Sequence, residues 1–283
     1  MRKLFLLLLV GGFLNCTHYG KLKMLSYLPN GLREVSGVQV TSDSNALWMI
    51  NDSGNEPELY EVSLKGEIKN VFAVQAKNHD WEAITSDKKG NVYIADFGNN
   101  NNKRKNLVIL KINKQELLEN DVIEVEKIKF SYPNQTKYPP KKKDRFFDAE
   151  SLLYKDGFLY VFTKSRVHNN YGKTVLYRIP ASKGDYTAEY ISEMEHCSDV
   201  NCSITDAAIS PDGKKVALLT HQSVLVFTNF QEDDFLSGDM ENYSFDHISQ
   251  KEGITFKDNS TLYITDEASK MMSARLYEFS LKK

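Results

Sequence analysis

The stretch DWEAITSDKKGNVYIADFGNN, residues 80–100, contains one full copy of the pattern that decides the fold. Asp80 and Glu82 precede a small residue and an apolar one, a polar turn follows at 87–90, and the apolar run 92–95 ends on Asp96. Two short β-strands joined by a tight turn have this pattern. A third apolar run follows at 107–112, so the unit is a meander of at least three strands.

The same pattern occurs five times along the chain, with copies that begin near residues 36, 82, 150, 207 and 252. Each copy has a first strand, a polar turn, a second strand that ends on polar residues, and a third apolar strand. Further strand-like stretches lie at 68–76, 122–132, 186–194 and 243–248. Four antiparallel strands per repeat are typical of a β-propeller blade.

The fifth copy has no fourth strand of its own, because the chain ends soon after its third strand. Residues 21–28 form a spare strand before the first copy, and a propeller has to close its ring. We therefore predict an all-β protein: a single β-propeller of five four-stranded antiparallel blades, closed by the N-terminal strand. The long interval between the second and third copies leaves six blades as the alternative. A turn or two of helix is expected only near 114–119.

The first fifteen residues have the pattern of a signal peptide, with a basic head at 2–3 and an apolar segment at 4–10 that is too short to span a bilayer. The segment resembles a bacterial lipoprotein signal that ends at Cys16, although Phe13 and Asn15 depart from the usual pattern. We expect export, lipidation of Cys16, a tether over 16–20 and a propeller over 21–283. The expected location is the periplasmic face of the outer membrane.

The composition favours a folded chain: 283 residues are 41% hydrophobic and 11% aromatic, which excludes the disordered class. The net charge of −2 and the lack of a recognisable motif argue against nucleic-acid binding, and we expect a monomer. Basic clusters at 103–105 and 141–145 fall in predicted loops. Solvated loop charge is favoured there over a site for an anionic ligand.

The chain contains three cysteines. Cys16 is assigned to the lipid, which leaves Cys197 and Cys202 in the segment CSDVNC. Disulfides persist in exported proteins, so we predict that these two cysteines are bonded. A metal site is the weaker alternative, because only His196 stands nearby as a further ligand.

Polar residues recur at both ends of the predicted hairpins. Glu82, Glu150 and Glu252 lie near the start of first strands, and other polar side chains end the second strands. Because first and second strands are antiparallel, both sets are expected at one mouth of the channel. The predicted ligand-binding residues are Asn51, Asp52, Asp80, Glu82, Asp96, Asp148, Glu150, Glu252 and Asp266.

Oxygen ligands that converge from several strands suit Ca²⁺, which takes six to eight of them. The alternative is that these acids hold the blades together by accepting backbone hydrogen bonds, or have local roles in turns. His79 and His221 are the histidines best placed for proton transfer, and each has a loop position as its alternative explanation. No motif centred on a nucleophilic serine and no phosphate-binding loop is found.

The opening EVSGVQVTSDSNALWMINDSGNEPELYEVSLKGEI, residues 34–68, together with DWEAI, YIADFGNN, DAESLL, ITDAAISPDGKKVALLT and EGITF, resembles a group of secreted bacterial propeller proteins. More remotely, the chain is similar to calcium-dependent propeller hydrolases, which include gluconolactonase-like and paraoxonase-like lactonases and phytase-like esterases. This resemblance implies Ca²⁺ as a cofactor in the channel. The metal ligands that it implies are Glu82, Glu150, Glu252, Asn51 and Asp96.

Two hypotheses about function follow. The first is an exported, lipid-anchored propeller that binds a small ligand or a protein partner at an acidic channel mouth. The alternative is a Ca²⁺-dependent hydrolase of a lactone, an ester or a phosphoester. The absence of a recognisable nucleophile favours the first hypothesis, and the ring of acidic residues favours the second.

Overall fold

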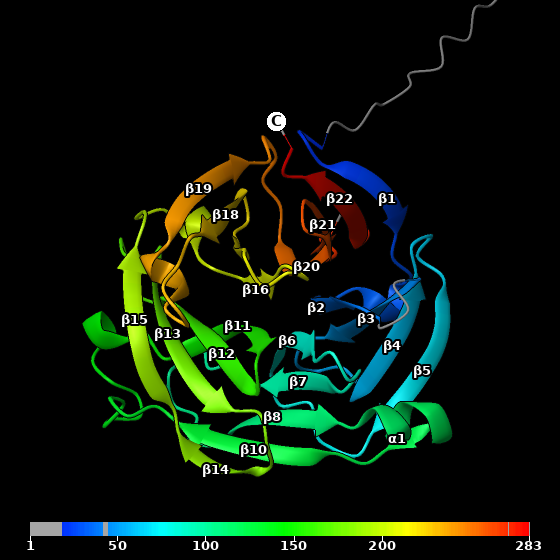
Figure 1. The fold of residues 1–283 in the computed structure, drawn as a ribbon, viewed down its shortest axis with the longest axis horizontal. Helices are drawn as coiled ribbons and strands as arrows, with labels where there is room; N and C mark the ends of the chain where they lie inside the picture. The colour runs from blue at the N-terminus through cyan, green and yellow to red at the C-terminus, as the bar shows by residue number, and fades with distance from the viewer. Residues whose placement is uncertain (1–18, 42–44, 271, 283) are drawn as a thin grey trace, which may run out of the picture.

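The computed structural model describes residues 19–41, 45–270 and 272–282. In this part of the chain five sheets surround a central axis (Figure 1). The predicted five-bladed β-propeller is therefore confirmed, and the six-bladed alternative is wrong. The predicted signal peptide and Cys16 lie outside the described residues. Within the described ranges, no helix combines the length and the apolar character needed to cross a bilayer.

The first two blades have five strands each, because each gains a short parallel strand at its outer edge. The first blade contains β2 (Val35–Val40), β3 (Ala46–Asn51), β4 (Glu58–Ser63), β5 (Ile68–Val74) and β9 (Val122–Ile123). The second contains β6 (Trp81–Ser86), β7 (Val92–Asp96), β8 (Leu107–Ile112), β10 (Glu126–Ser131) and β14 (Gly184–Thr187). The helix α1 (Lys114–Glu119) lies between β8 and β9.

The other three blades have four strands. The third contains β11 (Asp148–Lys155), β12 (Phe158–Lys164), β13 (Lys173–Pro180) and β15 (Glu189–Glu195). The fourth contains β16 (Asp206–Ile209), β17 (Val216–Leu219), β18 (Ser223–Thr228) and β19 (Asp239–Ser244). The fifth contains β20 (Lys251–Asp258), β21 (Thr261–Asp266), β22 (Arg275–Ser280) and β1 (Lys23–Tyr27). Four 3-10 helices in the described ranges connect strands: Asn30–Leu32, Lys142–Asp144, Val200–Cys202 and Phe235–Ser237.

Three of the predicted fourth strands need correction. The stretch 122–132 divides into β9 and β10, which belong to different blades, and 186–194 divides in the same way between β14 and β15. The last strand of the fourth blade, β19, ends at Ser244, whereas the prediction placed it at 243–248. These are outer strands with many exposed residues, so burial imposes no clear apolar pattern that would locate them.

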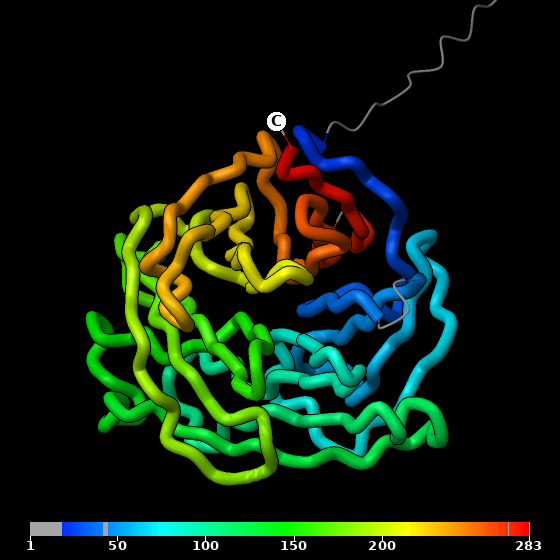
Figure 2. The backbone as a smooth tube through the Cα atoms, in the orientation of Figure 1, coloured from blue at the N-terminus to red at the C-terminus, as the bar shows by residue number. Residues whose placement is uncertain are grey.

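The ring closes through its innermost strands and through the N-terminal strand. β2 contacts β6, and the series continues through β11, β16 and β20 back to β2. β1 pairs antiparallel with β22, with Met24 opposite Tyr277. Figures 1 and 2 show this blue N-terminal segment beside the red C-terminal one. The predicted closure by residues 21–28 is confirmed.

In the described residues the core consists of five hydrophobic clusters, each between two neighbouring blades. Between the first two blades, for example, Ile50 packs in the same cluster as Trp81 and Ile94. The inner strands are thus buried on both faces, which explains their continuous apolar runs. A Cβ atom on Gly37 would lie 3.1 Å from the backbone nitrogen of Ile84, so glycine lets β2 approach β6 closely.

Candidate functional site

A shift of strand register recurs at the start of the innermost strand in four of the five blades. It falls between Val35 and Gly37, Trp81 and Ala83, Ala149 and Ser151, and Lys251 and Gly253. A β-bulge of this kind leaves one extra residue unpaired and re-aims its side chain. The extra residues are Ser36, Glu82, Glu150 and Glu252.

These bulges place the three glutamates around one mouth of the channel. All three line a cavity of about 250 Å³, together with residues at or just after the ends of the second strands, such as Lys164 and Asp52. The register pairs the start of β6 with the end of β7, with Trp81 opposite Asp96. Hence the start of the first strand and the end of the second do meet at the same end of a blade.

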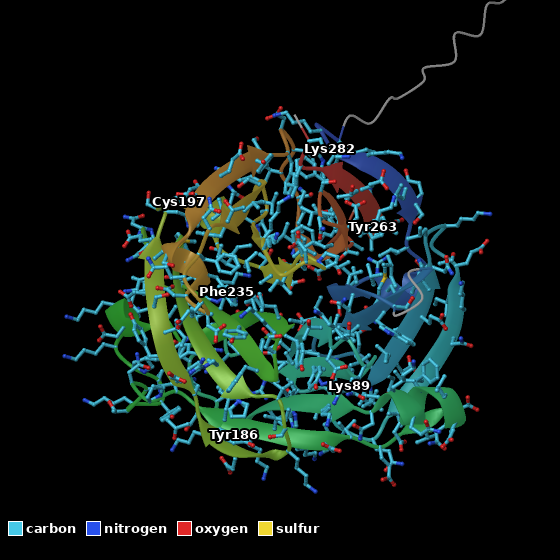
Figure 3. All side chains as sticks on the ribbon, in the orientation of Figure 1. Lys89, Tyr186, Cys197, Phe235, Tyr263 and Lys282 are labelled. Atoms are coloured by element: carbon cyan, nitrogen blue, oxygen red, sulfur yellow. A yellow bond between two sulfur atoms is a disulfide. The ribbon has the colours of Figure 1, made fainter. Side chains whose placement is uncertain are left out.

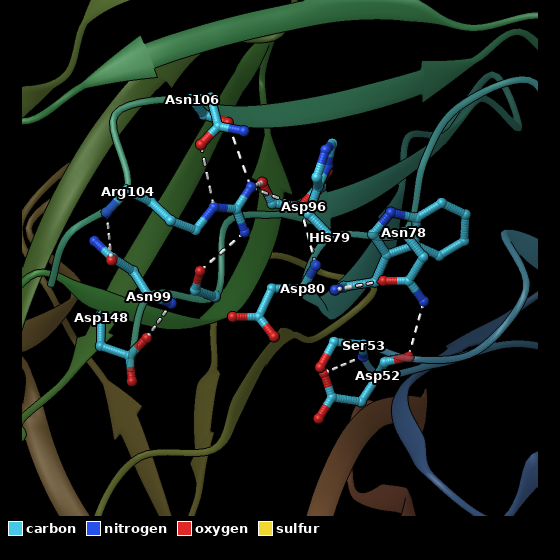
Figure 4. Close-up of polar contacts among 12 residues, drawn as sticks. Asp52, Ser53, Asn78, His79, Asp80, Asp96, Asn99, Arg104, Asn106 and Asp148 are labelled. Carbon is cyan, nitrogen blue, oxygen red and sulfur yellow. Dashed lines mark hydrogen bonds and ion pairs between the residues drawn. The ribbon is translucent and has the colours of Figure 1, made fainter. Parts of the chain in front are cut away.

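Asp52, Asp80 and Glu82 form what we call the carboxylate cluster. One carboxylate oxygen from each lies within 4.8 Å of the others, close enough for a shared metal ion. Glu82 is only 7% exposed, and no described residue donates a hydrogen bond to its carboxylate. Figure 4 shows the Asp80 carboxylate in the space between Asp52 and Asp148. The cluster joins residues of the first and second blades.

Gly98 provides the wall against which this cluster packs. A Cβ atom at this position would lie 2.3 Å from Oε1 of Glu82 and 2.5 Å from Oδ2 of Asp80. Any side chain here would displace both carboxylates. The glycine therefore permits the arrangement, and its backbone N–H donates a hydrogen bond to the Asp80 carbonyl oxygen at 3.1 Å.

In the absence of a cation, the surroundings of the carboxylate cluster raise the pKa values of all three carboxyl groups. Burial, with the charge of Asp80 adding to it, raises the pKa of Asp52 to about 6. Burial also raises the pKa of Asp80, and the pKa of Glu82 rises well above its usual range through burial and the charges of Glu150 and Asp52. Desolvation and like charge both disfavour the ionised form, and a bound cation would reverse this preference.

Asp148, Glu150, Lys164 and Arg166 form the ion-paired cluster of the third blade. Arg166 contacts Asp148 at 2.5 Å and Glu150 at 2.7 Å, and the Lys164 ammonium lies 3.1 Å from Glu150. Burial raises the pKa of Glu150 to about 8 against the lowering effect of the two cations. For Lys164, burial opposes the charged form, but Glu150 and Glu252 raise its pKa overall, so it remains cationic.

Asp96 and His79 form a pair outside the carboxylate cluster. The Asp96 carboxylate contacts Nδ1 of His79 at 2.7 Å and accepts a hydrogen bond from Arg104 at 2.8 Å. It also accepts the backbone N–H of Asp80 at 3.2 Å. The His79 ring lies beside Asp96 and is turned away from Asp52 (Figure 4). Asp96 thus holds the loop that precedes β6 in place, and His79 does not face the cavity that Glu82 lines.

The other predicted residues divide between blade contacts and the cavity. The Asn51 amide donates to the Gly31 carbonyl oxygen at 2.7 Å, and Asp266 accepts the Tyr277 hydroxyl at 2.7 Å inside the fifth blade. Nε2 of His221 lies 3.4 Å from Glu252. Burial acts to raise the pKa of Glu252, but Lys164 and His221 lower it overall.

Arg166, Gly98 and Glu267 were not among the predicted ligand-binding residues. Burial and the charges of Glu252 and Asp52 raise the pKa of Glu267 to about 7. Each of these residues comes one or two positions after a strand end that was recognised as polar, which is the signal that could have found them. Asp206 was also missed; it accepts the backbone N–H of Ile254 at 2.8 Å and so links two blades.

Cys197 and Cys202 are joined by a disulfide, and Cys197 lies at the periphery of the molecule in Figure 3. His196 also lies within reach of both sulfur atoms. Because sulfurs bonded to each other are not thiolates, this group is not suited to hold a metal. The disulfide closes the loop that follows β15.

No protein-family model and no curated protein matches this chain. Among solved structures, the fold is similar to the PQQ-bound form of aldose sugar dehydrogenase from Streptomyces coelicolor, with a TM-score of 0.52 and 10% identity over 92% of this chain and 97% of that chain. It is also similar to a glucose dehydrogenase, with a TM-score of 0.51 and 9% identity over 90% of this chain and 99% of that one. At such identities the similarity shows the fold alone.

Proposed function

We propose that this protein is an exported, lipid-anchored β-propeller that binds Ca²⁺ at the carboxylate cluster and uses that channel mouth to bind a small ligand or a protein partner. The observation that carries the proposal is the convergence of three carboxylates within 4.8 Å around Glu82, which is buried and receives no hydrogen bond from the described residues. All three donors are hard oxygens, the type that Ca²⁺ prefers.

The carboxylates of Asp52, Asp80 and Glu82 fit a bound cation better than they fit a role in holding the blades together by accepting hydrogen bonds. A blade-to-blade hydrogen bond from the Ile254 backbone N–H is accepted by Asp206, and Arg166 forms an ion pair with Asp148. No such partner is found for Glu82 among the described residues. Gly98 leaves room for its carboxylate and that of Asp80 to face each other. When bound, Ca²⁺ would supply the missing positive charge and could coordinate an oxygen atom of the ligand.

A calcium titration followed by thermal melting tests the proposal. A ligand that binds only the native state raises the melting temperature by mass action, so we expect a saturable rise for the wild-type protein. Glu82→Gln and Gly98→Ala should each abolish the rise, whereas Glu124→Gln, which removes an exposed carboxylate between β9 and β10, should retain it. A wild-type protein that melts identically in calcium and in chelator would contradict the proposal.

A Ca²⁺-dependent hydrolase is the second candidate function, and Glu150 favours it. This carboxyl group lines the same cavity as Glu82, and burial raises its pKa to about 8, within the range useful for proton transfer near neutral pH. The test is turnover of a lactone, an aryl ester and an aryl phosphate in calcium and in chelator. Turnover that requires calcium and is lost in Glu150→Gln would support it; no turnover of any of the three would leave ligand binding as the function.

Export and lipid anchoring are supported by the signal-like residues 1–15, by Cys16 and by the Cys197–Cys202 disulfide. Palmitate labelling with membrane fractionation tests this part of the proposal. We expect label on the wild-type protein and none on Cys16→Ser, which should be released from the membrane fraction. Equal retention of an unlabelled wild-type protein would contradict lipid anchoring.

A further inference from the structure

A second cavity lies at the opposite mouth of the channel. It has a volume of about 510 Å³ and is lined by the last residues of the innermost strands and the turns that follow them. We call it the turn-side cavity. All five blades contribute to it, and it shares no residue with the acidic cavity, the one that Glu82, Glu150 and Glu252 line. Because the innermost strands start at the acidic mouth and end here, the two cavities are at opposite ends.

The wall of the turn-side cavity is of the mixed type that binds small molecules. Tyr154, Ile209 and Phe256 supply apolar surface. Thr85 also lines the cavity; it is 6% exposed, and its hydroxyl makes no hydrogen bond with any other described residue. Ligand sites commonly combine a cavity of several hundred Å³, apolar side chains and a few polar groups.

Two of the three carboxylates that line this mouth, Asp87 and Asp212, accept hydrogen bonds within their own turns, and the third, Asp156, lies 3.5 Å from the Lys155 ammonium. Asp87 accepts the backbone N–H groups of Lys89 at 2.9 Å and Asn91 at 3.0 Å, and the Tyr93 hydroxyl at 3.1 Å. Asp212 accepts the Ser210 hydroxyl at 2.6 Å, and the hydrogen bonds in its turn lower its pKa. Hydrogen bonds do not remove the charge of a carboxylate, so the cavity wall combines three acidic residues, Asp87, Asp156 and Asp212, with four lysines, Lys88, Lys89, Lys155 and Lys257.

The ammonium groups divide into paired and unpaired ones. Lys155 is paired with Asp233 at 2.7 Å, and Lys257 with Glu278 at 2.7 Å. Lys88 and Lys89 are exposed, and neither forms an ion pair with any residue in the described ranges. These two positive charges thus lie at the edge of a cavity whose wall is partly apolar and partly polar, in a protein whose other mouth is acidic.

We propose that the turn-side cavity binds a small organic anion with an apolar body, of the carboxylate or sulfonate class. The apolar body packs against Tyr154, Ile209 and Phe256, the anionic group contacts Lys88 and Lys89, and the Thr85 hydroxyl donates a hydrogen bond. This site is separate from the carboxylate cluster and does not require Ca²⁺.

Titration with 1-anilinonaphthalene-8-sulfonate, an aromatic sulfonate whose fluorescence rises in apolar surroundings, tests the proposal. We expect saturable binding to the native protein, and about tenfold weaker binding to Lys88→Glu/Lys89→Glu, because two charge contacts are reversed. The matched control Lys103→Glu/Lys105→Glu makes the same charge change on an exposed loop of the same blade. It should bind the probe as the wild type does, and equal melting temperatures will show that all three proteins are folded.

Three results would overturn the proposal: no saturable binding, equal binding by the Lys88→Glu/Lys89→Glu variant, or equally tight binding of the uncharged analogue N-phenyl-1-naphthylamine. Repeating the titration in saturating calcium separates this site from the proposed calcium site. We expect the same dissociation constant with and without calcium, so the failure of one proposal leaves the other intact. A dissociation constant that changes with calcium would contradict the separation of the two sites.

Discussion

Glu82 of the second blade and Glu150 of the third occupy equivalent bulges, yet their surroundings differ. Glu150 is paired with Lys164, the last residue of the second strand of its own blade, and with Arg166, which follows that strand. The corresponding positions in the second blade, by register from Trp81–Asp96 and Ala149–Thr163, are occupied by Phe97 and Asn99. The second blade thus has the buried carboxylate without the cations.

This difference separates a structural role from a ligand-binding role at one repeat position. In the third blade the chain supplies its own positive charge, so the carboxylates are satisfied without a ligand. In the second blade two further carboxylates, Asp52 and Asp80, approach Glu82 instead. A residue that repeats in several blades therefore need not have the same function in each. The residues at the end of the adjacent second strand decide whether the charge of the glutamate is balanced.

The largest expected effect comes from breaking the ion-paired cluster. Lys164→Met leaves Glu150 in a buried site with only Arg166 as its partner, and removing one member of a buried pair should lower the free energy of unfolding by about 3 kcal/mol. Urea denaturation in chelator measures this. The double variant Lys164→Met/Glu150→Gln should recover much of the loss; a double variant that is less stable than Lys164→Met would contradict the assigned pairing.

A smaller effect of opposite sign is expected at Glu82. Burial and the charges of Glu150 and Asp52 raise the pKa of Glu82 well above its usual range, so ionising this group costs the folded apo protein free energy that it does not cost the unfolded chain; Glu82→Gln should therefore raise the free energy of unfolding in chelator by about 1 kcal/mol. The same denaturation experiment should show Glu150→Gln to be destabilising although burial raises the pKa of Glu150, because the charge of Glu150 offsets the burial of both Lys164 and Arg166 and its loss leaves two buried cations without that partner. If both variants changed the free energy of unfolding in the same direction, the distinction between the carboxylate cluster and the ion-paired cluster would be lost.

The smallest expected effect is a pH dependence of the calcium response. The raised pKa values of Asp52, about 6, and Glu267, about 7, mean that the folded apo protein holds more protons than the unfolded chain above about pH 4. Stability in chelator should therefore fall as the pH rises from 5 to 8. Calcium competes with those protons, so the rise in melting temperature that it causes should be larger at pH 8 than at pH 5. A calcium effect that is constant over this range would argue against Asp52 as a calcium ligand.

The apolar pattern predicted the parts of the fold that are buried. The runs 92–95 and 107–112 were recognised because the strands are covered on both faces by neighbouring blades, which leaves little room for polar residues. The outer strands β10, β15 and β19 are partly exposed, and their ends were misplaced. The strands β9 and β14 pair with blades other than those next to them in sequence, and no local pattern records such a pairing.

The sequence by itself determined the repeat, the closure of the ring by residues 21–28, and the position of Glu82, Glu150 and Glu252 at one channel mouth. These features follow from period and strand direction, which are properties of the chain. Only the tertiary structure decided which glutamate is neutralised, because that depends on distances between side chains of different strands: 2.7 Å from Arg166 to Glu150, and carboxylates instead of cations around Glu82. Charge balance is a sum over neighbours in space, and the sequence lists neighbours only along the chain.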